Sequence, residues 1–222
     1  MLRRALGRRR VGQAGAFDHQ AVEGQLAGRN GVSPRVTLCR SNAGVLACAI
    51  AAARGGQRPH VVGGIRDLAD EVREAQALYE GRVQDIPETS PFRRFATWQE
   101  LCEEAEQTGD VALERLIQSV EGGIARDLVV LERMHVSAEE SADEVFGTAH
   151  RAKGREWPEV VLHEDFPDID RLTRRYGAAQ RSGRPADPRA VLEEWHVLYV
   201  ATTRAIDTLV LPPRLFDWLG GD

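Results

Sequence analysis

The sequence has 222 residues and is 42% hydrophobic, which is enough for one sizeable globular domain with a small insertion. The formal net charge is −5, and because residues 1–10 contribute five arginines and no acid, the remaining residues sum to −10. This balance excludes a broadly basic surface for nucleic acid. Any nucleic-acid contact must come from a local group of backbone amides, hydroxyls and a few arginines.

Neither membrane insertion nor export is indicated. The longest apolar run, at 43–53, is well short of the roughly 20 residues that span a bilayer, and no apolar signal region follows the arginines of 1–10. The three cysteines are odd in number and form no CxxC pair, which predicts neither a disulfide framework nor a zinc site. We therefore expect a cytoplasmic protein without a metal site. Residues 1–31 are expected to form a basic N-terminal segment, either an arm or a poorly ordered terminus.

Residues 32–81 predict the first part of an α/β domain. A short buried strand is expected at 34–40, followed by a turn, an apolar helix and a glycine stop at 41–56. A second strand at 58–64 ends in two glycines, and 65–81 carries apolar residues at helical spacing. Strand, helix, strand, helix is the order typical of a parallel sheet with helices on its faces.

The pattern changes over 82–140, where charged helical segments without convincing strands predict a helical insertion. Strand character returns in 141–222, the second part of the α/β domain. The elements expected there are a strand at 143–149, a strand at 157–166, a mobile loop at 176–188, a helix at 189–205 and a strand at 207–213 that two prolines stop.

The sequence contains no phosphate-binding P-loop. Such a loop, GxxxxGK followed by Ser or Thr, needs a lysine directly before a hydroxyl residue, and Lys153, the single lysine, precedes Gly154. The nearest candidate for a Walker B strand, "DLADEVREAQ", has the pattern of a charged helix face. The chain alone is therefore predicted not to hydrolyse a nucleotide.

Two arginines lie at the ends of predicted elements, where a guanidinium can reach a phosphate group. In "VTLCRSNAGV", Arg40 follows a strand and reaches over the carboxyl edge of a parallel sheet, although such an arginine is more often in a surface ion pair. In "LYVATTRA", Arg204 lies near the end of a helix. It suits an arginine finger that reaches a γ-phosphate, and equally a cation that compensates the helix dipole.

The segment "TAHRAKGREW" joins a strand to a glycine turn. Thr148 and His150 can bond phosphate oxygens, and Gly154 allows close approach of the backbone. Glu156 can accept a hydrogen bond from a ribose hydroxyl. A purely structural turn that ends in glycine and contains a hydrogen-bonded histidine explains the composition equally well. The compact ammonium of Lys153 is expected to bond carbonyls or a carboxylate in this turn, where a planar guanidinium would fit poorly.

In this order, the three segments resemble motifs of the C-terminal motor domain of UvrD/Rep-type superfamily 1 DNA helicases. "TLCRSNAGV" is similar to motif IV, "TAHRAKGREW" to motif V and "EEWHVLYVATTRA" to motif VI. "VVGG", "ATWQEL" and "HEDF" are most similar to the F-box DNA helicase branch. The resemblance covers about 32–212 and implies an α/β, RecA-like parallel sheet flanked by helices, with a small helical insertion.

The resemblance further implies that the chain is the C-terminal part of an ATP-dependent DNA helicase or single-stranded DNA translocase. ATP with Mg²⁺ would be held mainly by an N-terminal motor domain, in cis or in trans. Arg40 and Arg204 would face the γ-phosphate. The residues implied at the nucleotide are Arg40, Gly154, Glu156 and Arg204, and those implied at single-stranded DNA are Thr148, His150 and Arg151.

Two departures from the family pattern are visible. Arg155 stands where the family often has leucine, which alters the packing expected for the turn, and motifs I, Ia, II and III do not occur in the sequence. Two other interpretations stay open. The chain can be a non-catalytic nucleic-acid-binding or regulatory module derived from a helicase domain, or a structural α/β domain in which the motifs are coincidental.

Overall fold

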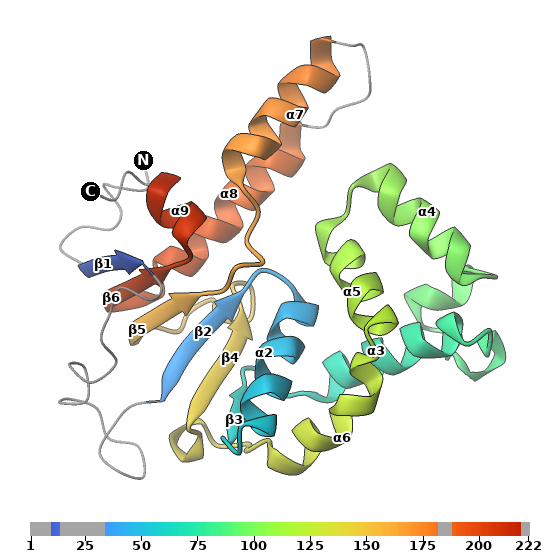
Figure 1. Ribbon diagram of the computed structural model, residues 1–222, viewed down its shortest axis with the longest axis horizontal. Coiled ribbons are helices and arrows are strands. Elements are labelled where there is room, and N and C mark those ends of the chain that lie inside the picture. Colours follow the sequence, from blue (N-terminus) through green and yellow to red (C-terminus); the bar gives the residue numbers. More distant parts are fainter. Residues whose placement is uncertain (1–9, 14–33, 182–187, 219–222) are drawn as a thin grey trace. The chain divides into compact units, whose positions relative to one another are not determined.

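The computed structural model describes residues 10–13, 34–181 and 188–218 (Figure 1). The chain divides into two compact units. The first unit contains the described parts of 1–40 and 147–222, and the second unit is 41–146. Most of the predicted basic segment and residues 182–187 of the predicted loop lie outside the described residues.

Four parallel strands form the sheet structure of the first unit, in the order β1-β6-β5-β2. These strands are β1 (Arg10–Gln13), β2 (Arg35–Cys39), β5 (Trp157–Leu162) and β6 (Ala205–Leu211). Leu38 lies opposite Leu162, and both side chains are buried. The register between β5 and β6 shifts next to Pro158, which has no N–H to donate to a neighbouring strand.

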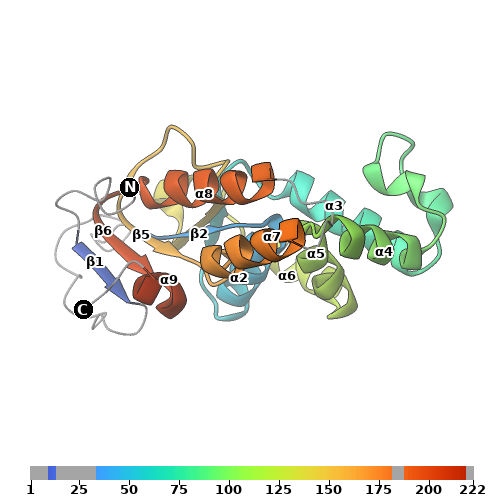
Figure 2. The ribbon, with the colours of Figure 1, turned by 90° about the horizontal axis from the view of Figure 1, so that it is seen from above.

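Among the described residues, three helices accompany this sheet. α7 (Ile169–Arg181) and α8 (Pro188–Thr202) lie side by side, and α8 also packs on β5 and β6 (Figures 1 and 2). α9 (Pro213–Trp218) packs on β1 and β6. The rings of Trp195 and Trp218 meet edge to face at 5.0 Å, and the indole N–H of Trp218 donates to Asp170. These contacts tie the three helices to one another.

The structure corrects the predicted elements of this region in two places. The helix expected to run to residue 205 ends at Thr202, so Arg204 lies in the turn before β6. Residues 176–181, which were expected to belong to a loop, are helical, because α7 continues through Gly177 to Arg181 while it packs along α8. Pro213 starts α9 as well as ending the preceding strand, since proline is well tolerated at a first helical position.

Outside residues 82–140, the second unit contains two helices and a pair of parallel strands. The helices are α2 (Asn42–Arg54) and α3 (Arg66–Tyr79), and the strands are β3 (Pro59–Val61) and β4 (Glu144–Thr148), which runs into the first unit. Ser41 caps α2, because its hydroxyl accepts the N–H of Gly44 at 3.0 Å. α2 is apolar around most of its circumference, which fits its packing against β3 and several helices of the same unit.

Residues 82–140 are helical, as the sequence predicts. They form α4 (Trp98–Thr108), α5 (Val111–Glu121) and α6 (Ile124–Met134), with short 3₁₀ turns η1 (Val83–Asp85), η2 (Pro91–Arg94) and η3 (Glu139–Ser141). α5 and α6 pack on both α2 and α3. None of the described helices has the length and apolar character needed to cross a membrane. Parallel strands flanked by helices confirm the predicted α/β, RecA-like class.

Two histidine rings pack together in the second unit. The ring of His60, in β3, stacks on that of His135 at 6.0 Å, and its Nδ1 lies 3.0 Å from the carbonyl oxygen of Val136. The Nε2 atom of His135 is buried and has no hydrogen-bond partner among the described residues. Burial, and secondly the neighbouring His60, lower the pKa of His135.

We predict that His135 makes the chain less stable in mild acid. Because its folded pKa lies below the unfolded value of about 6.5, the unfolded state binds more protons, and the free energy of unfolding falls as pH drops below that value. Urea titrations near neutral pH and about two pH units lower measure this loss. In His135→Asn the loss is smaller, whereas His150→Asn, which changes an exposed histidine, keeps it. An unchanged loss in His135→Asn would contradict the assignment.

Candidate functional site

All the site residues predicted from the sequence lie in the first unit. Arg40 follows β2, Arg204 precedes β6, and the other predicted residues occupy the end of β4 and the turn that connects it to β5. The site can therefore be described within one unit. The residues concerned are Arg40, Thr148, His150, Arg151, Gly154, Glu156 and Arg204.

Arg40 is held by a carboxylate on α8. Its Nε and Nη2 atoms donate to the two carboxylate oxygens of Glu194 at 2.7 and 2.6 Å, a bidentate pair. The side chains are 20% and 12% exposed, so the pair is largely shielded from water. The backbone N–H of Arg40 donates to Asp165, which is buried beyond the end of β5. This arrangement agrees with the simpler interpretation of Arg40, in which a strand-terminal arginine forms an ion pair.

Arg204 is held by uncharged acceptors. Its Nε donates to the carbonyl oxygen of Val200 at 2.9 Å, its Nη1 to that of Arg155 at 3.0 Å and its Nη2 to the hydroxyl of Thr203. The carbonyl of Arg204 accepts the N–H of Trp157 at 2.9 Å. The residue thus closes the end of α8, as expected of a cation there, and also joins α8 to the turn before β5.

The two arginines leave the sheet from opposite edges. Because β2, β5 and β6 are parallel, Arg40 lies at their carboxyl edge and Arg204 at their amino edge. Along α8, the residue that binds Arg40 and the last helical residue, Thr202, are about 12 Å apart at the usual rise of about 1.5 Å per residue. Each guanidinium has its own set of partners in this structure.

The turn after β4 is organised by Thr148. This side chain is 6% exposed, and its Oγ1 accepts the backbone N–H of Arg151 at 3.2 Å, while its carbonyl accepts that of Ala152. The backbone N–H of Ala149, the residue after Thr148, donates to the carbonyl oxygen of Cys39 at the end of β2. The ring of His150 is exposed and Arg151 is partly exposed. Of the three residues predicted to bind DNA, Thr148 is therefore the least accessible.

The second half of the turn is open to solvent. Lys153, Gly154, Arg155 and Glu156 are all exposed, and Gly154 has a φ of +83°, a conformation that other residues adopt only with strain. Among the described residues, the ammonium of Lys153 has no hydrogen-bond or ion-pair partner. The expected bonds from Lys153 to carbonyls or a carboxylate are therefore wrong, because its side chain extends into solvent.

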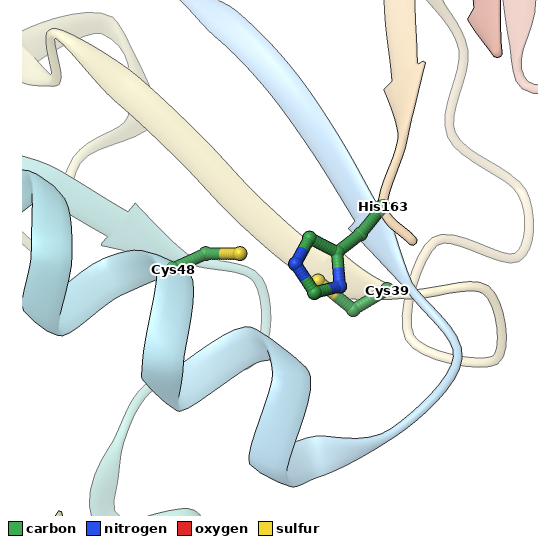
Figure 3. A group of neighbouring side chains, drawn as sticks. All are labelled: Cys39, Cys48 and His163. Carbon is green, nitrogen blue, oxygen red and sulfur yellow. The ribbon is translucent and has the colours of Figure 1, made fainter. Parts of the chain in front are cut away.

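Two partners of Arg40 were not predicted. Asp165 belongs to the "HEDF" segment after β5, and an acid that follows a parallel strand is an available signal for a residue at the carboxyl edge. Glu194 is 154 residues away from Arg40 in sequence, so no local pattern connects them. Figure 3 shows Cys39 and His163, which belong to the first unit, and Cys48 of α2 in the second unit; none of the three cysteines is in a disulfide.

Comparison with known proteins identifies one family. The family model described as the UvrD-like helicase C-terminal domain matches residues 72–212, which include the segments that resemble motifs V and VI, while Arg40 lies before the match. F-box DNA helicase 1 of Gallus gallus is 30% identical over 106 residues, which are 46% of this chain and 10% of the relative. The chain therefore spans about a tenth of the length of that relative.

We predict that Gly154 is required for the shape of the turn. Gly154→Ala has free space for its methyl group, but its positive φ costs about 1–2 kcal/mol of unfolding free energy in an L-residue. Gly177→Ala, inside α7, is the matched control and raises stability by about 0.5–1 kcal/mol, because alanine favours a helix. Urea titration measures both changes. Wild-type stability in Gly154→Ala would refute the role of this conformation.

Proposed function

Because the chain belongs to the UvrD-like helicase C-terminal domain family, we propose that it is the C-terminal part of a UvrD-like ATP-dependent DNA helicase or single-stranded DNA translocase. In this proposal an N-terminal motor domain, in cis or in trans, holds ATP and Mg²⁺. In that assembly Arg40 and Arg204, which lie at opposite edges of the sheet in this structure, leave their present partners and stabilise negative charge that develops on the γ-phosphate during hydrolysis. The turn from Thr148 to Arg151 contacts single-stranded DNA, and the protein acts in the cytoplasm.

The observation that carries the proposal is the bond from Arg204 to the turn before β5. Its guanidinium donates to the carbonyl of Arg155, so the arginine proposed to sense nucleotide is joined to the turn proposed to bind DNA. If Arg204 moves to a phosphate, it releases that carbonyl. The turn, which also carries His150, is then free to shift relative to α8. This exchange links the nucleotide to DNA through one side chain.

The residues present fit the charge-stabilising part of a nucleotide site. ATP, when bound, supplies the phosphoryl group that is transferred to water. A guanidinium prefers an anionic phosphate oxygen to a neutral carbonyl, so Arg204 gains charge-assisted bonds when it leaves Val200 and Arg155. Arg40 exchanges one anion for another, because it must first leave the carboxylate of Glu194. The two arginines therefore respond to nucleotide with different energetic costs.

On the DNA side, we propose that the exposed groups make the direct contacts. His150 is exposed and Arg151 partly exposed, and both ring N–H and guanidinium groups bind phosphate oxygens. Thr148 contributes by holding the backbone N–H of Arg151, which sets the direction of the turn. On the nucleotide side, Glu156 is exposed at the end of the turn, where the ribose hydroxyl of ATP can reach it, and Gly154 leaves the backbone beside it uncovered.

We predict that the 222-residue chain alone has no measurable ATPase activity. Addition of the N-terminal motor domain of a UvrD-like helicase restores DNA-stimulated hydrolysis. In this assembly Arg204→Ala and Arg40→Ala each lower kcat by about 10³-fold or more, the usual effect of an arginine finger. Arg214→Ala, an exposed arginine of α9, is the matched control and leaves kcat unchanged.

Two results would contradict the proposal. Robust hydrolysis by the chain alone would show that it carries a complete nucleotide site. DNA binding without any recovery of hydrolysis would favour the alternative function, a nucleic-acid-binding or regulatory module that has kept the fold and lost the motor activity.

We predict that Glu194 restrains Arg40 until nucleotide binds. In the reassembled enzyme, Glu194→Gln removes the competing charge and lowers the KM for ATP by about 3- to 10-fold, as expected for an ion pair lost from a partly buried position. Glu193→Gln changes the neighbouring exposed carboxylate and leaves KM unaltered. Steady-state kinetics measure both. An unchanged or raised KM in Glu194→Gln would mean that the pair does not oppose nucleotide binding.

A further inference from the structure

α7 presents a row of arginines that the proposed function does not use. Arg171, Arg174 and Arg181 fall within about 80° of the helix circumference, because residues advance by about 100° each. All three side chains are exposed. The sequence pattern alone did not predict this face, since part of it was expected to be a loop.

These arginines lack the partners that other arginines of the chain have. Among the described residues, no hydrogen bond or ion pair engages the guanidinium of Arg171, Arg174 or Arg181. The one acid of α7, Asp170, accepts the indole N–H of Trp218. In the second unit, by contrast, six arginines are paired with carboxylates, namely Arg54, Arg58, Arg73, Arg82, Arg93 and Arg94. Within the part of the chain that the structure describes, the face on α7 thus carries positive charge that no ion pair neutralises, in a protein whose net charge is negative.

The opposite side of α7 is fixed to the first unit. Ile169 is 2% exposed, and Leu172 and Tyr176 are partly buried on that side, where α7 packs against α8 (Figure 2). The hydroxyl of Tyr176 accepts a hydrogen bond from Gln180 at 2.6 Å. The helix is therefore held in place by one face while the arginines extend from the other. A preorganised row of cations loses little conformational freedom of the backbone on binding.

We propose that this arginine face binds the phosphate backbone of duplex DNA without regard to base sequence. From Arg171 to Arg181 the helix axis rises about 15 Å, a length over which duplex DNA carries about nine phosphate charges. Arginine is suited to phosphate oxygens because its planar fork donates two parallel hydrogen bonds. Charge complementarity therefore identifies a polyanion as the occupant.

The composition of the face favours a duplex over a single strand. Sites for single-stranded DNA combine positive charge with aromatic side chains on which bases stack. Tyr176, the aromatic residue of α7, lies on the opposite side of the helix and bonds Gln180. The described arginine face thus offers charged contacts to phosphates and no aromatic ring on which bases stack. The proposed duplex contact is separate from the ATP-linked activity and requires no nucleotide.

The test compares variants of the full 222-residue chain by fluorescence anisotropy with a labelled duplex of about 20 base pairs at several salt concentrations. The triple variant Arg171→Gln, Arg174→Gln, Arg181→Gln is expected to bind about 10-fold or more weakly. The slope of log K against log salt is expected to fall by about 2.7 in magnitude, at about 0.9 per lost phosphate contact. The corresponding triple lysine variant keeps the charges and retains most of the slope.

A second triple variant controls for net charge. Arg73→Gln, Arg82→Gln and Arg94→Gln removes three exposed, ion-paired arginines of the second unit and is expected to bind duplex as the wild type does. Far-UV circular dichroism checks that the helices are kept. Equal affinity of the two glutamine variants would overturn the proposal. So would a loss confined to the matching single strand, or no duplex binding by the wild type, which would point to a protein partner instead.

Discussion

The hydrogen bonds of Arg204 are the interaction on which the arrangement of the helicase motifs depends. Its guanidinium binds the last turn of α8 and the carbonyl of Arg155, and its own carbonyl accepts the N–H of Trp157 at the start of β5. Motif VI and motif V are therefore joined at the amino edge of the sheet. Because these acceptors are neutral, a phosphate anion competes for the guanidinium effectively, and in the proposed motor nucleotide opens this joint.

Arg40 shows a different form of restraint at the other edge of the sheet. A bidentate, largely shielded ion pair with Glu194 neutralises its charge in this structure. Breaking such a pair is unfavourable unless another anion replaces the carboxylate at the same time. In the proposed motor, the arrival of the second motor domain with its nucleotide supplies that anion. The two arginines would then respond to bound nucleotide by breaking two separate contacts with one helix, α8.

Much of the fold was predictable because its strands and helices have strong local patterns. The buried strand before Arg40, the apolar α2 and the helical stretch 82–140 follow from hydrophobic periodicity and from glycine stops. Two family motifs were recognisable for the same local reason. α7 was missed because Gly177 and the small number of apolar residues weaken its helical pattern, while its packing on α8 stabilises it.

The interactions within the site were less predictable because they connect distant positions. The pairing of Arg40 with Glu194 joins residues on β2 and α8, and no spacing rule links them. Thr148 is buried at the end of β4, and its hydroxyl accepts the backbone N–H of Arg151, an arrangement that a motif does not reveal. Lys153, in contrast, lies in the recognised motif and extends into solvent. Motif recognition thus proposed the site residues, and the structure shows their present partners.

The central claim is that Arg204 acts on charge that develops during phosphoryl transfer. The most direct measurement is the affinity of the reassembled enzyme for ATP and for ADP with aluminium fluoride, a transition-state analogue. An interaction made chiefly in the transition state predicts that Arg204→Ala weakens binding of the analogue about 10²-fold more than binding of ATP. Equal losses for the two ligands, or no loss for either, would contradict the account.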